Sequence, residues 1–342
     1  MIRLPGNDRS RRGCSLFQYD YQAHVRGGAC TLNAREFRIR LGHVTKQAVQ
    51  AATFGAINFF GILVRKLSSR QTRRLAFLIV DFMHRVIGLR RALVYGNLRL
   101  TFPDKSAAEI RRIARDVYRN LASTLFEVLR LPLVRSREDA AALVDIDGSE
   151  FLHRTRDRQS GAVIVSAHYG NWELMAMAFG LLVHPITIIV KRLHNQPIDQ
   201  QINEYRTMMG NSVVDQSQSL RHGLRLLQNG GMLAILGDQS DPDAANYGEF
   251  LGRRASIFHG PAFFALKANV PLFVTICHSN GDGRYTIDIR EVETSDLSFS
   301  KDDIATLASR YTSVLEEEIL RRPEEWFWLH DRWKRSDMKA TS

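Results

Sequence analysis

A histidine and a glutamate stand close together in the segment SAHYGNWEL, residues 166–174. His168 follows the apolar, β-branched run GAVIV, which is typical of a buried strand, and Glu173 comes five positions later. A neutral imidazole can take a proton from a hydroxyl group. A carboxylate on its other ring nitrogen fixes the tautomer and stabilises the imidazolium. The pair therefore predicts general-base chemistry, and a purely structural His–Glu hydrogen bond is the alternative.

A turn must bring these two side chains together. Residues five apart on a helix are separated by about 140°, so His168 and Glu173 cannot share a helical face, but Gly170 permits a tight turn between them. We expect His168 at the carboxyl end of a strand, where open α/β sheets bind ligands, and Glu173 in the first turn of the next helix. Asn171 either orients His168 or caps that helix. The reacting hydroxyl is expected to belong to the substrate, because the sequence has no G-x-S-x-G nucleophile elbow.

Strands and helices alternate around this segment. Helical patterns lie between most of the apolar runs, and a last helix is predicted at 302–323. This order predicts the α/β class, with a mostly parallel central sheet flanked by helices. Apolar runs predict strands at 142–148, 161–168, 185–191, 211–215, 231–239, 271–280 and 284–292.

The N-terminal part is predicted to be helical and to contact a membrane. Residues 1–44 are basic, rich in Gly and Arg, and predicted to be a disordered extension without a cleavable signal peptide. Residues 45–135 are predicted to be helical, with a membrane-anchor candidate at 46–66. That stretch is short for a span of about 20 residues, so it either crosses the membrane, lies in the interface with its basic flanks, or is a buried amphipathic helix. Residues 136–336 are predicted to form the catalytic α/β region, in one domain with 70–135.

Composition narrows the class of partner. The 342 residues include 47 Lys and Arg against 36 Asp and Glu, a net charge of +11. This balance favours an anionic partner: nucleic acid, anionic lipid, a phosphorylated substrate or an acidic carrier protein. We predict no nucleic-acid partner, because the charge is spread and no nucleic-acid-binding signature is found. The three cysteines have no zinc-site spacing, so no metal is predicted, and their sparse number suits a reducing compartment.

Six blocks of sequence follow one another along the chain: NLRLTFPDKSAAEIRRI, SAHYGNWEL with its H-x-x-x-x-E, VKRLHNQPID, GDQSDPD, FLGRRASIFHGPAFFALKANVP and PEEWFWLHDRWK. In this order they resemble the lipid A biosynthesis acyltransferases, the late acyltransferases of lipopolysaccharide assembly within the lysophospholipid-acyltransferase superfamily. The resemblance covers about residues 45–335 and implies an acyltransferase-type αβα fold. The third block departs from the family pattern at Leu193 and Gln196, where an Arg-Pro and then an Asn-Pro are usual.

The resemblance implies an O-acyltransferase on the cytoplasmic face of the bacterial inner membrane. It would move a fatty acyl chain from acyl carrier protein, or from coenzyme A, to a hydroxyl of a lipid A precursor or another anionic lipid. His168 would be the general base and Glu173 its partner, with no metal and no bound cofactor. Arginine suits the phosphates of such an acceptor. The predicted substrate-binding residues are Asn171, Arg192, Asp238, Gly252, Arg253 and Arg254.

Alternatives remain for several of these residues and for the function. The arginines could be solvated or ion-paired, and Asp238, which ends a predicted strand, could be a turn or cap residue. Trp326, Trp328 and Trp333 are expected to pack in the core rather than at a membrane interface. The function could instead be acyl transfer to another lipid or glycolipid, non-catalytic binding of an anionic membrane or nucleic acid, or hydrolysis of the thioester.

Overall fold

The computed structural model describes residues 34–150, 160–241 and 246–334, with the backbone alone for 34–46. The chain divides into two units, 1–49 and 50–342. The first helix, α1, begins at Ala34 and therefore includes the last part of the predicted disordered extension, while residues 1–33 lie outside the described part of the chain. The N-terminal helices are α1 (Ala34–Arg65), α2 (Ser69–Val86), α3 (Arg91–Thr101), α4 (Ala107–Val128) and α5 (Arg137–Leu143).

Serine capping boxes start three of these helices. At the start of α4, the Ser106 hydroxyl accepts a hydrogen bond from the Glu109 backbone amide, and the Glu109 side chain accepts one from the Ser106 backbone amide. Equivalent pairs begin α2 at Ser68 and α5 at Ser136. Part of α1, Gln47–Arg65, is long and apolar enough to cross a membrane: its mean hydropathy is 1.4 and 11% of it is buried. The helices α1 to α4 together confirm that residues 45–135 are mainly helical, as predicted.

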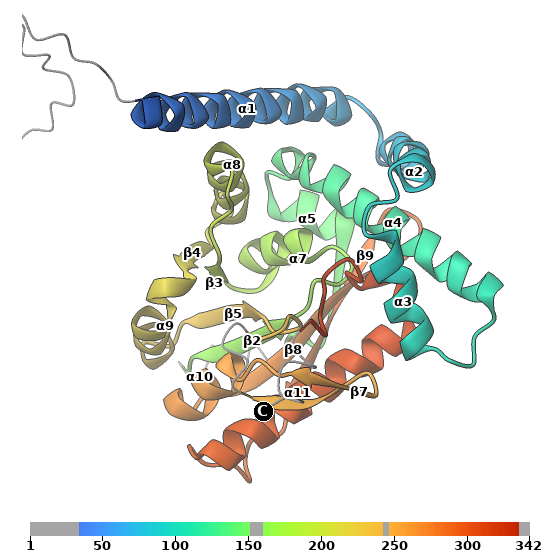
Figure 1. The fold of residues 1–342 in the computed structure, drawn as a ribbon. Coiled ribbons are helices and arrows are strands. Elements are labelled where there is room, and N and C mark those ends of the chain that lie inside the picture. Colours follow the sequence, from blue (N-terminus) through green and yellow to red (C-terminus); the bar gives the residue numbers. More distant parts are fainter. Residues whose placement is uncertain (1–33, 151–159, 242–245, 335–342) are drawn as a thin grey trace, which may run out of the picture. The chain divides into compact units, whose positions relative to one another are not determined.

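A seven-stranded sheet forms the centre of the second unit (Figure 1). Its strand order is β1-β9-β8-β2-β5-β3-β4, and every neighbouring pair is parallel except β8 with β9. All seven predicted strands are present, and the mostly parallel α/β class is confirmed. The strands are β1 (Val144–Asp147), β2 (Ala162–Ser166), β3 (Ile186–Val190), β4 (Ser212–Asp215), β5 (Met232–Leu236), β8 (Leu272–Ser279) and β9 (Tyr285–Val292).

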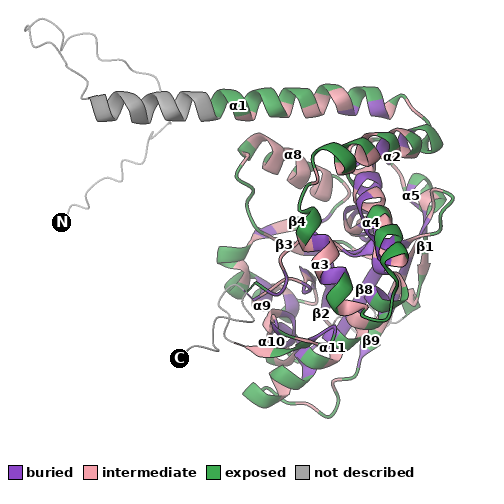
Figure 2. Ribbon diagram, turned by 45° about the vertical axis from the view of Figure 1, so that its right-hand side comes forward, coloured by how far each residue is buried: buried purple, intermediate pink, exposed green. Residues whose placement is uncertain are grey.

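Helices cover both faces of the sheet, so the central strands are apolar on both sides. In β2, Val163 and Val165 join one buried cluster with α10 and α11, whereas Ala162 and Ile164 join another with α5 and α7. Figure 1 shows these two pairs of helices on opposite sides of the sheet, and Figure 2 shows the buried strands between them. The remaining helices are α7 (Trp172–Ala178), α8 (Gln196–Thr207), α9 (Ser219–Gln228), α10 (Gly260–Ala268) and α11 (Lys301–Arg321).

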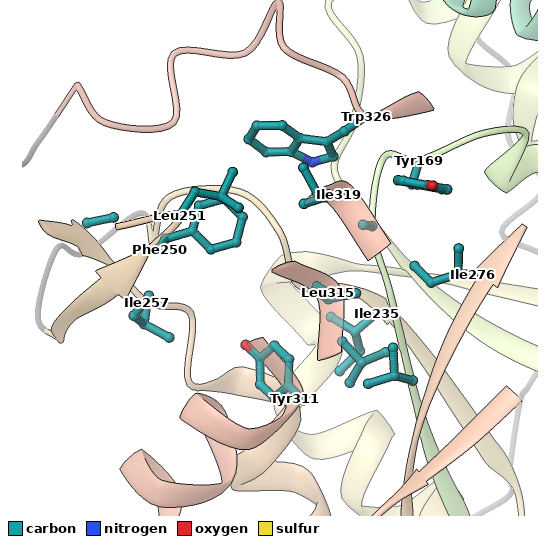
Figure 3. Close-up of a cluster of buried hydrophobic side chains, with 14 of the residues drawn as sticks. Tyr169, Ile235, Phe250, Leu251, Ile257, Ile276, Tyr311, Leu315, Ile319 and Trp326 are labelled. Atoms are coloured by element: carbon teal, nitrogen blue, oxygen red, sulfur yellow. The ribbon is translucent and has the colours of Figure 1, made fainter. Parts of the chain in front are cut away.

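The tryptophan-rich C-terminal segment packs in the core, as predicted. Trp326, Trp328 and Trp333 are at most 5% exposed and contact one another edge to face or stacked. Trp326 also packs against Phe250, and Figure 3 shows this side chain within the buried cluster that includes Leu315 and Ile319. The last segment of the chain is therefore an integral part of the core.

A small hairpin was not expected from the sequence. Strands β6 (Tyr247–Phe250) and β7 (Arg253–Ser256) pair antiparallel through a two-residue turn. Both turn residues, Leu251 and Gly252, have positive φ angles of 52° and 71°, as a type I′ turn requires. The structure therefore gives Gly252 a definite role in the turn, whereas its predicted contact with substrate remains a prediction.

We predict that Gly252→Val lowers the free energy of unfolding by about 1–2 kcal/mol through backbone strain. A Cβ atom at this position would meet nothing within 4 Å, so a clash would not contribute. Gly252→Asn is the matched control, because Asn tolerates left-handed backbone. Thermal unfolding of both variants is the measurement. An equal loss in both would show that the conformation of the turn is not what requires glycine.

Candidate active site

His168 lies in a short loop between β2 and α7. Asn171 caps α7, since its side-chain oxygen accepts a hydrogen bond from the Leu174 amide at 3.0 Å. Gly170 has a φ of +53°, and a Cβ there would collide with the backbone carbonyl of Cys277. The predicted turn at Gly170 is therefore observed, and two independent constraints require glycine: the left-handed backbone and the close approach of β8.

Asp238, rather than Glu173, is the carboxylate that contacts the histidine. His168 Nδ1 and Asp238 Oδ1 are 2.9 Å apart. The strand register explains the contact: β2 and β5 are parallel neighbours with Ser166 opposite Leu236, so the residues two positions farther along each strand leave the sheet side by side. Asp238 is 3% exposed, and its other oxygen accepts a hydrogen bond from Trp326 Nε1 at 2.9 Å.

This contact shifts the pKa values of both groups. Burial disfavours the charged imidazole, but the charge and the hydrogen bond of Asp238 outweigh it, so the pKa of His168 is raised. Burial also works against an ionised Asp238. The charge and hydrogen bond of His168 and the hydrogen bond from Trp326 nevertheless hold the pKa of Asp238 below its usual value. With Asp238 ionised, the neutral imidazole carries its proton on Nδ1 and directs the lone pair of Nε2 away from the carboxylate.

Aromatic rings and one amide surround the imidazole. The rings of Trp172 and Phe327 lie 5.3 and 6.1 Å from that of His168, centre to centre. The side-chain nitrogen of Gln239 is 3.3 Å from both ring nitrogens. The side chain of His168 is 23% exposed, whereas Asp238 is almost fully covered. The histidine is thus accessible from one side and is held from the other.

Glu173 has a different partner from the one predicted. Its two carboxylate oxygens accept hydrogen bonds from Nε and Nη2 of Arg206, at 2.9 and 2.5 Å. Glu173 is in the first turn of α7, as expected, but it faces α8, which carries Arg206. It acts on His168 only through space, where its negative charge contributes to the raised pKa.

Helix α4 supports the catalytic loop and the C-terminal segment. Thr124 Oγ1 donates to the Gly170 carbonyl at 2.8 Å, and Asn120 donates to the Glu325 carbonyl at 3.2 Å. Glu127 accepts hydrogen bonds from Asn171 Nδ2, at 2.8 Å, and from the Tyr285 hydroxyl. The side-chain oxygen of Asn171 therefore caps the helix, and its side-chain nitrogen is bonded to Glu127. This arrangement favours the capping interpretation over a direct contact with His168.

The three arginines predicted to bind substrate have protein partners. Arg192 pairs with Asp215 at 2.9 Å and is 78% exposed at its side chain. Arg253 lies over Trp333 at 4.0 Å, and Arg254 over the ring of Tyr247 at 4.8 Å. Arg253 is joined to the site through the aromatic core, because Trp333 packs against Trp326. Binding of substrate by these arginines remains a prediction.

Comparison with known proteins assigns the family. Residues 43–335 match the family described as bacterial lipid A biosynthesis acyltransferase. The lipid A biosynthesis palmitoleoyltransferase of Escherichia coli K12 is 25% identical over 259 residues, which cover 72% of this chain and 79% of that protein. The lipid A biosynthesis lauroyltransferase of the same strain is 24% identical, with 75% and 82% covered. The phosphatidylinositol mannoside acyltransferase of Mycobacterium tuberculosis H37Rv is 24% identical, with 60% and 66% covered.

The α/β fold carries a His–Asp pair at the carboxyl ends of neighbouring parallel strands, an arrangement that is typical of enzymes using acid–base chemistry. The family match is more specific: the chain belongs to the bacterial lipid A biosynthesis acyltransferase family, as the sequence resemblance predicted. It is therefore an acyltransferase, and the alternative of a non-catalytic binding protein is set aside.

We predict that Glu173→Leu lowers the free energy of unfolding by about 3 kcal/mol, because it leaves the largely buried Arg206 charged and unpaired. The double variant Glu173→Leu/Arg206→Leu should recover part of this loss, since neither charge then lacks a partner. Chemical denaturation of the two single variants and the double variant is the measurement. Strictly additive losses would contradict an energetic coupling between the two side chains.

Proposed function

We propose that this enzyme transfers a fatty acyl chain from an acyl thioester, carried by acyl carrier protein, to a hydroxyl of a lipid A precursor. The observation that carries the proposal is the His168–Asp238 pair, which fixes Nδ1 and directs Nε2 away from the carboxylate, so that the acceptor hydroxyl would replace the Gln239 amide that lies 3.3 Å from Nε2. The names of the relatives support a lipid acceptor. The cytoplasmic face of the bacterial inner membrane is the proposed location, with the apolar part of α1 as the membrane contact.

The chemistry follows from the pair. The acceptor hydroxyl gives its proton to His168 Nε2, and its oxygen attacks the carbonyl carbon of the thioester to form a new C–O bond. Asp238 stabilises the imidazolium that results. The C–S bond then breaks, and the leaving thiolate takes the proton back from the imidazolium. The products are an ester and a free thiol, and His168 returns to its neutral state.

Two polar residues within the apolar helix have protein partners. Gln50 Nε2 donates to the His194 carbonyl at 2.8 Å, and Asn58 Oδ1 accepts from Gln201 at 2.5 Å. These residues interrupted the apolar run in the sequence. Their hydrogen bonds to α8 and the loop before it satisfy them without water, while Phe59 and Ile62 remain exposed. This division supports a helix with one face on protein and one face free for lipid.

A second acceptor class is supported by one comparison. Several of the related proteins are named phosphatidylinositol mannoside acyltransferase, including those of Mycobacterium tuberculosis and Mycolicibacterium smegmatis. A phosphorylated glycolipid other than a lipid A precursor is therefore the alternative acceptor. The His168–Asp238 pair does not discriminate between the two acceptors, since each of them offers a hydroxyl group.

The first test is an acyl-transfer assay with purified full-length protein. Donors are acyl carrier protein and coenzyme A thioesters; acceptors are a tetra-acylated lipid A precursor, a phosphatidylinositol mannoside, a lysophospholipid and none. We expect transfer to the lipid A precursor from the carrier-protein donor. His168→Ala should lose about 10²–10⁴-fold in rate, while His222→Ala, an exposed histidine on α9, should keep it. Wild-type turnover in His168→Ala would overturn the general-base role, and release of free fatty acid alone would indicate a hydrolase.

A second prediction concerns pH. The base acts only when neutral, so the rate falls as the pH drops through the pKa of His168. Asp238 raises that pKa, so Asp238→Asn should lower it. The acid limb of kcat/KM should then move to lower pH, with a reduced plateau. Glu173→Gln is the comparison. The charge of Glu173 raises the pKa of His168 less than the charge and hydrogen bond of Asp238 do, so the acid limb of the Glu173→Gln variant should move less. If the acid limb of kcat/KM does not move in Asp238→Asn, the result would contradict the assignment of Asp238 as the partner of His168.

A further inference from the structure

An arginine-lined pocket lies between α2, α3 and α4. Its volume is about 370 Å³, and Tyr95, His84 and Asp81 complete its lining together with the aliphatic Ala108. None of these residues belongs to the His168 site or was singled out from the sequence. The arginines in its lining are Arg85, Arg91, Arg111, Arg112 and Arg115.

The positive charge of this pocket is poorly compensated within it. Asp81 is the single carboxylate of the lining, and it is already engaged outside the pocket by Arg119, at 3.1 and 2.5 Å. Arg115 pairs with Asp116 at 3.5 Å, whereas the side chains of Arg111 and Arg112 make no hydrogen bond or ion pair with the described part of the chain. Clustered guanidinium groups repel one another unless an anion separates them, and their fork of N–H donors matches phosphate oxygens.

A buried imidazole nitrogen in the lining also lacks a partner. The ring of His84 is tilted against that of Tyr118, with ring centres 4.6 Å apart. Its Nε2 atom is shielded from solvent and has no hydrogen-bond partner among the described residues. Burial, together with the charge of Arg91, lowers the pKa of His84, so the positive charge of the pocket comes from the arginines.

The pocket adjoins an exposed apolar face of α2. Leu78, Phe82 and Val86 follow one another every fourth residue and are 71%, 64% and 66% exposed, so they form one line along the helix. Figure 2 shows how much of α2 is exposed. Arg85 lies on the same helix, beside Val86. The lining of the pocket and the apolar line thus meet on a single element.

We propose that this pocket binds the phosphate of an anionic membrane lipid, whose acyl chains lie against the apolar line of α2. Phosphate is the group that the arginines of the lining would recognise. A lipid is favoured over a free phosphate or an acidic protein because the apolar line continues from the pocket. In addition, only Lys66, Leu67 and Ser68 separate α2 from the membrane-span candidate that ends at Arg65. An amphipathic helix so close to a membrane segment lies at the depth of the headgroups.

The test uses the full chain in a neutral detergent, with lipid binding measured by native mass spectrometry. Phosphatidylglycerol is the probe, phosphatidylcholine the lipid control, and glycerol 3-phosphate and inorganic phosphate the soluble controls. Arg111→Gln/Arg112→Gln removes two exposed pocket charges. Arg221→Gln/Arg225→Gln, on α9, removes two exposed charges elsewhere and is the matched control. The measurement is independent of acyl transfer, so its failure is separate from failure of the proposed function.

We expect the pocket variant to bind phosphatidylglycerol about tenfold more weakly, while the α9 variant binds as the wild type does. Phosphatidylcholine should bind the wild type more weakly than phosphatidylglycerol. Equal weakening in both variants, or equal binding of the two lipids, would overturn the proposal. Tight binding of glycerol 3-phosphate or inorganic phosphate, lost in the pocket variant, would show a soluble anion site instead. Unchanged lipid binding, with weakened association of acyl carrier protein, would assign the pocket to a protein partner.

Discussion

The buried carboxylate of Asp238 is the constraint on which the site depends. A charge removed from water is costly unless hydrogen bonds and an opposite charge compensate it. Two donors reach it here: Nδ1 of His168 from the neighbouring strand and Nε1 of Trp326 from the C-terminal segment. The first hydrogen bond joins the charge to the histidine that is proposed to be the base, and the second joins it to the buried tryptophan cluster. The segment around Trp326, far from His168 in sequence, is therefore part of the candidate active site.

Much of this arrangement follows from the sequence, and the remainder needs the order of the strands. The β-branched run before His168 predicted both the strand and the position of the histidine at its end. Glu173 was predicted as its partner because it is near in sequence, but the first turn of α7 directs it toward Arg206. Asp238 ends another predicted strand, yet only the adjacency of β2 and β5 brings it to the imidazole. The β6–β7 hairpin escaped prediction because RRAS has no continuous apolar alternation, and its turn begins with an unusual left-handed Leu251.

The loop that carries His168 is held from several directions. Its backbone bonds to the C-terminal segment, where the Phe327 amide donates to the His168 carbonyl at 3.0 Å. Gly170 packs against β8, and Asn171 reaches Glu127. Burial raises the pKa of Glu127 against the hydrogen bonds from Tyr285 and Asn171. A general base must keep its geometry through the proton transfer, and a loop fixed by two strands, a helix and the chain end meets that need.

Helix α4 connects this rigid site to the basic surface. Its N-terminal half carries Arg111, Arg112 and Arg115, which line the pocket. Its C-terminal half carries the side chains that bond to the catalytic loop and to the segment behind it. A helix of 22 residues is about 33 Å long, at 1.5 Å per residue. Since a helix does not shorten or stretch appreciably, the distance between a lipid phosphate held by the arginines and the imidazole would be set by α4. If the acceptor is a membrane lipid, as proposed, α4 would act as the spacer that lets His168 meet the acceptor hydroxyl at a definite depth.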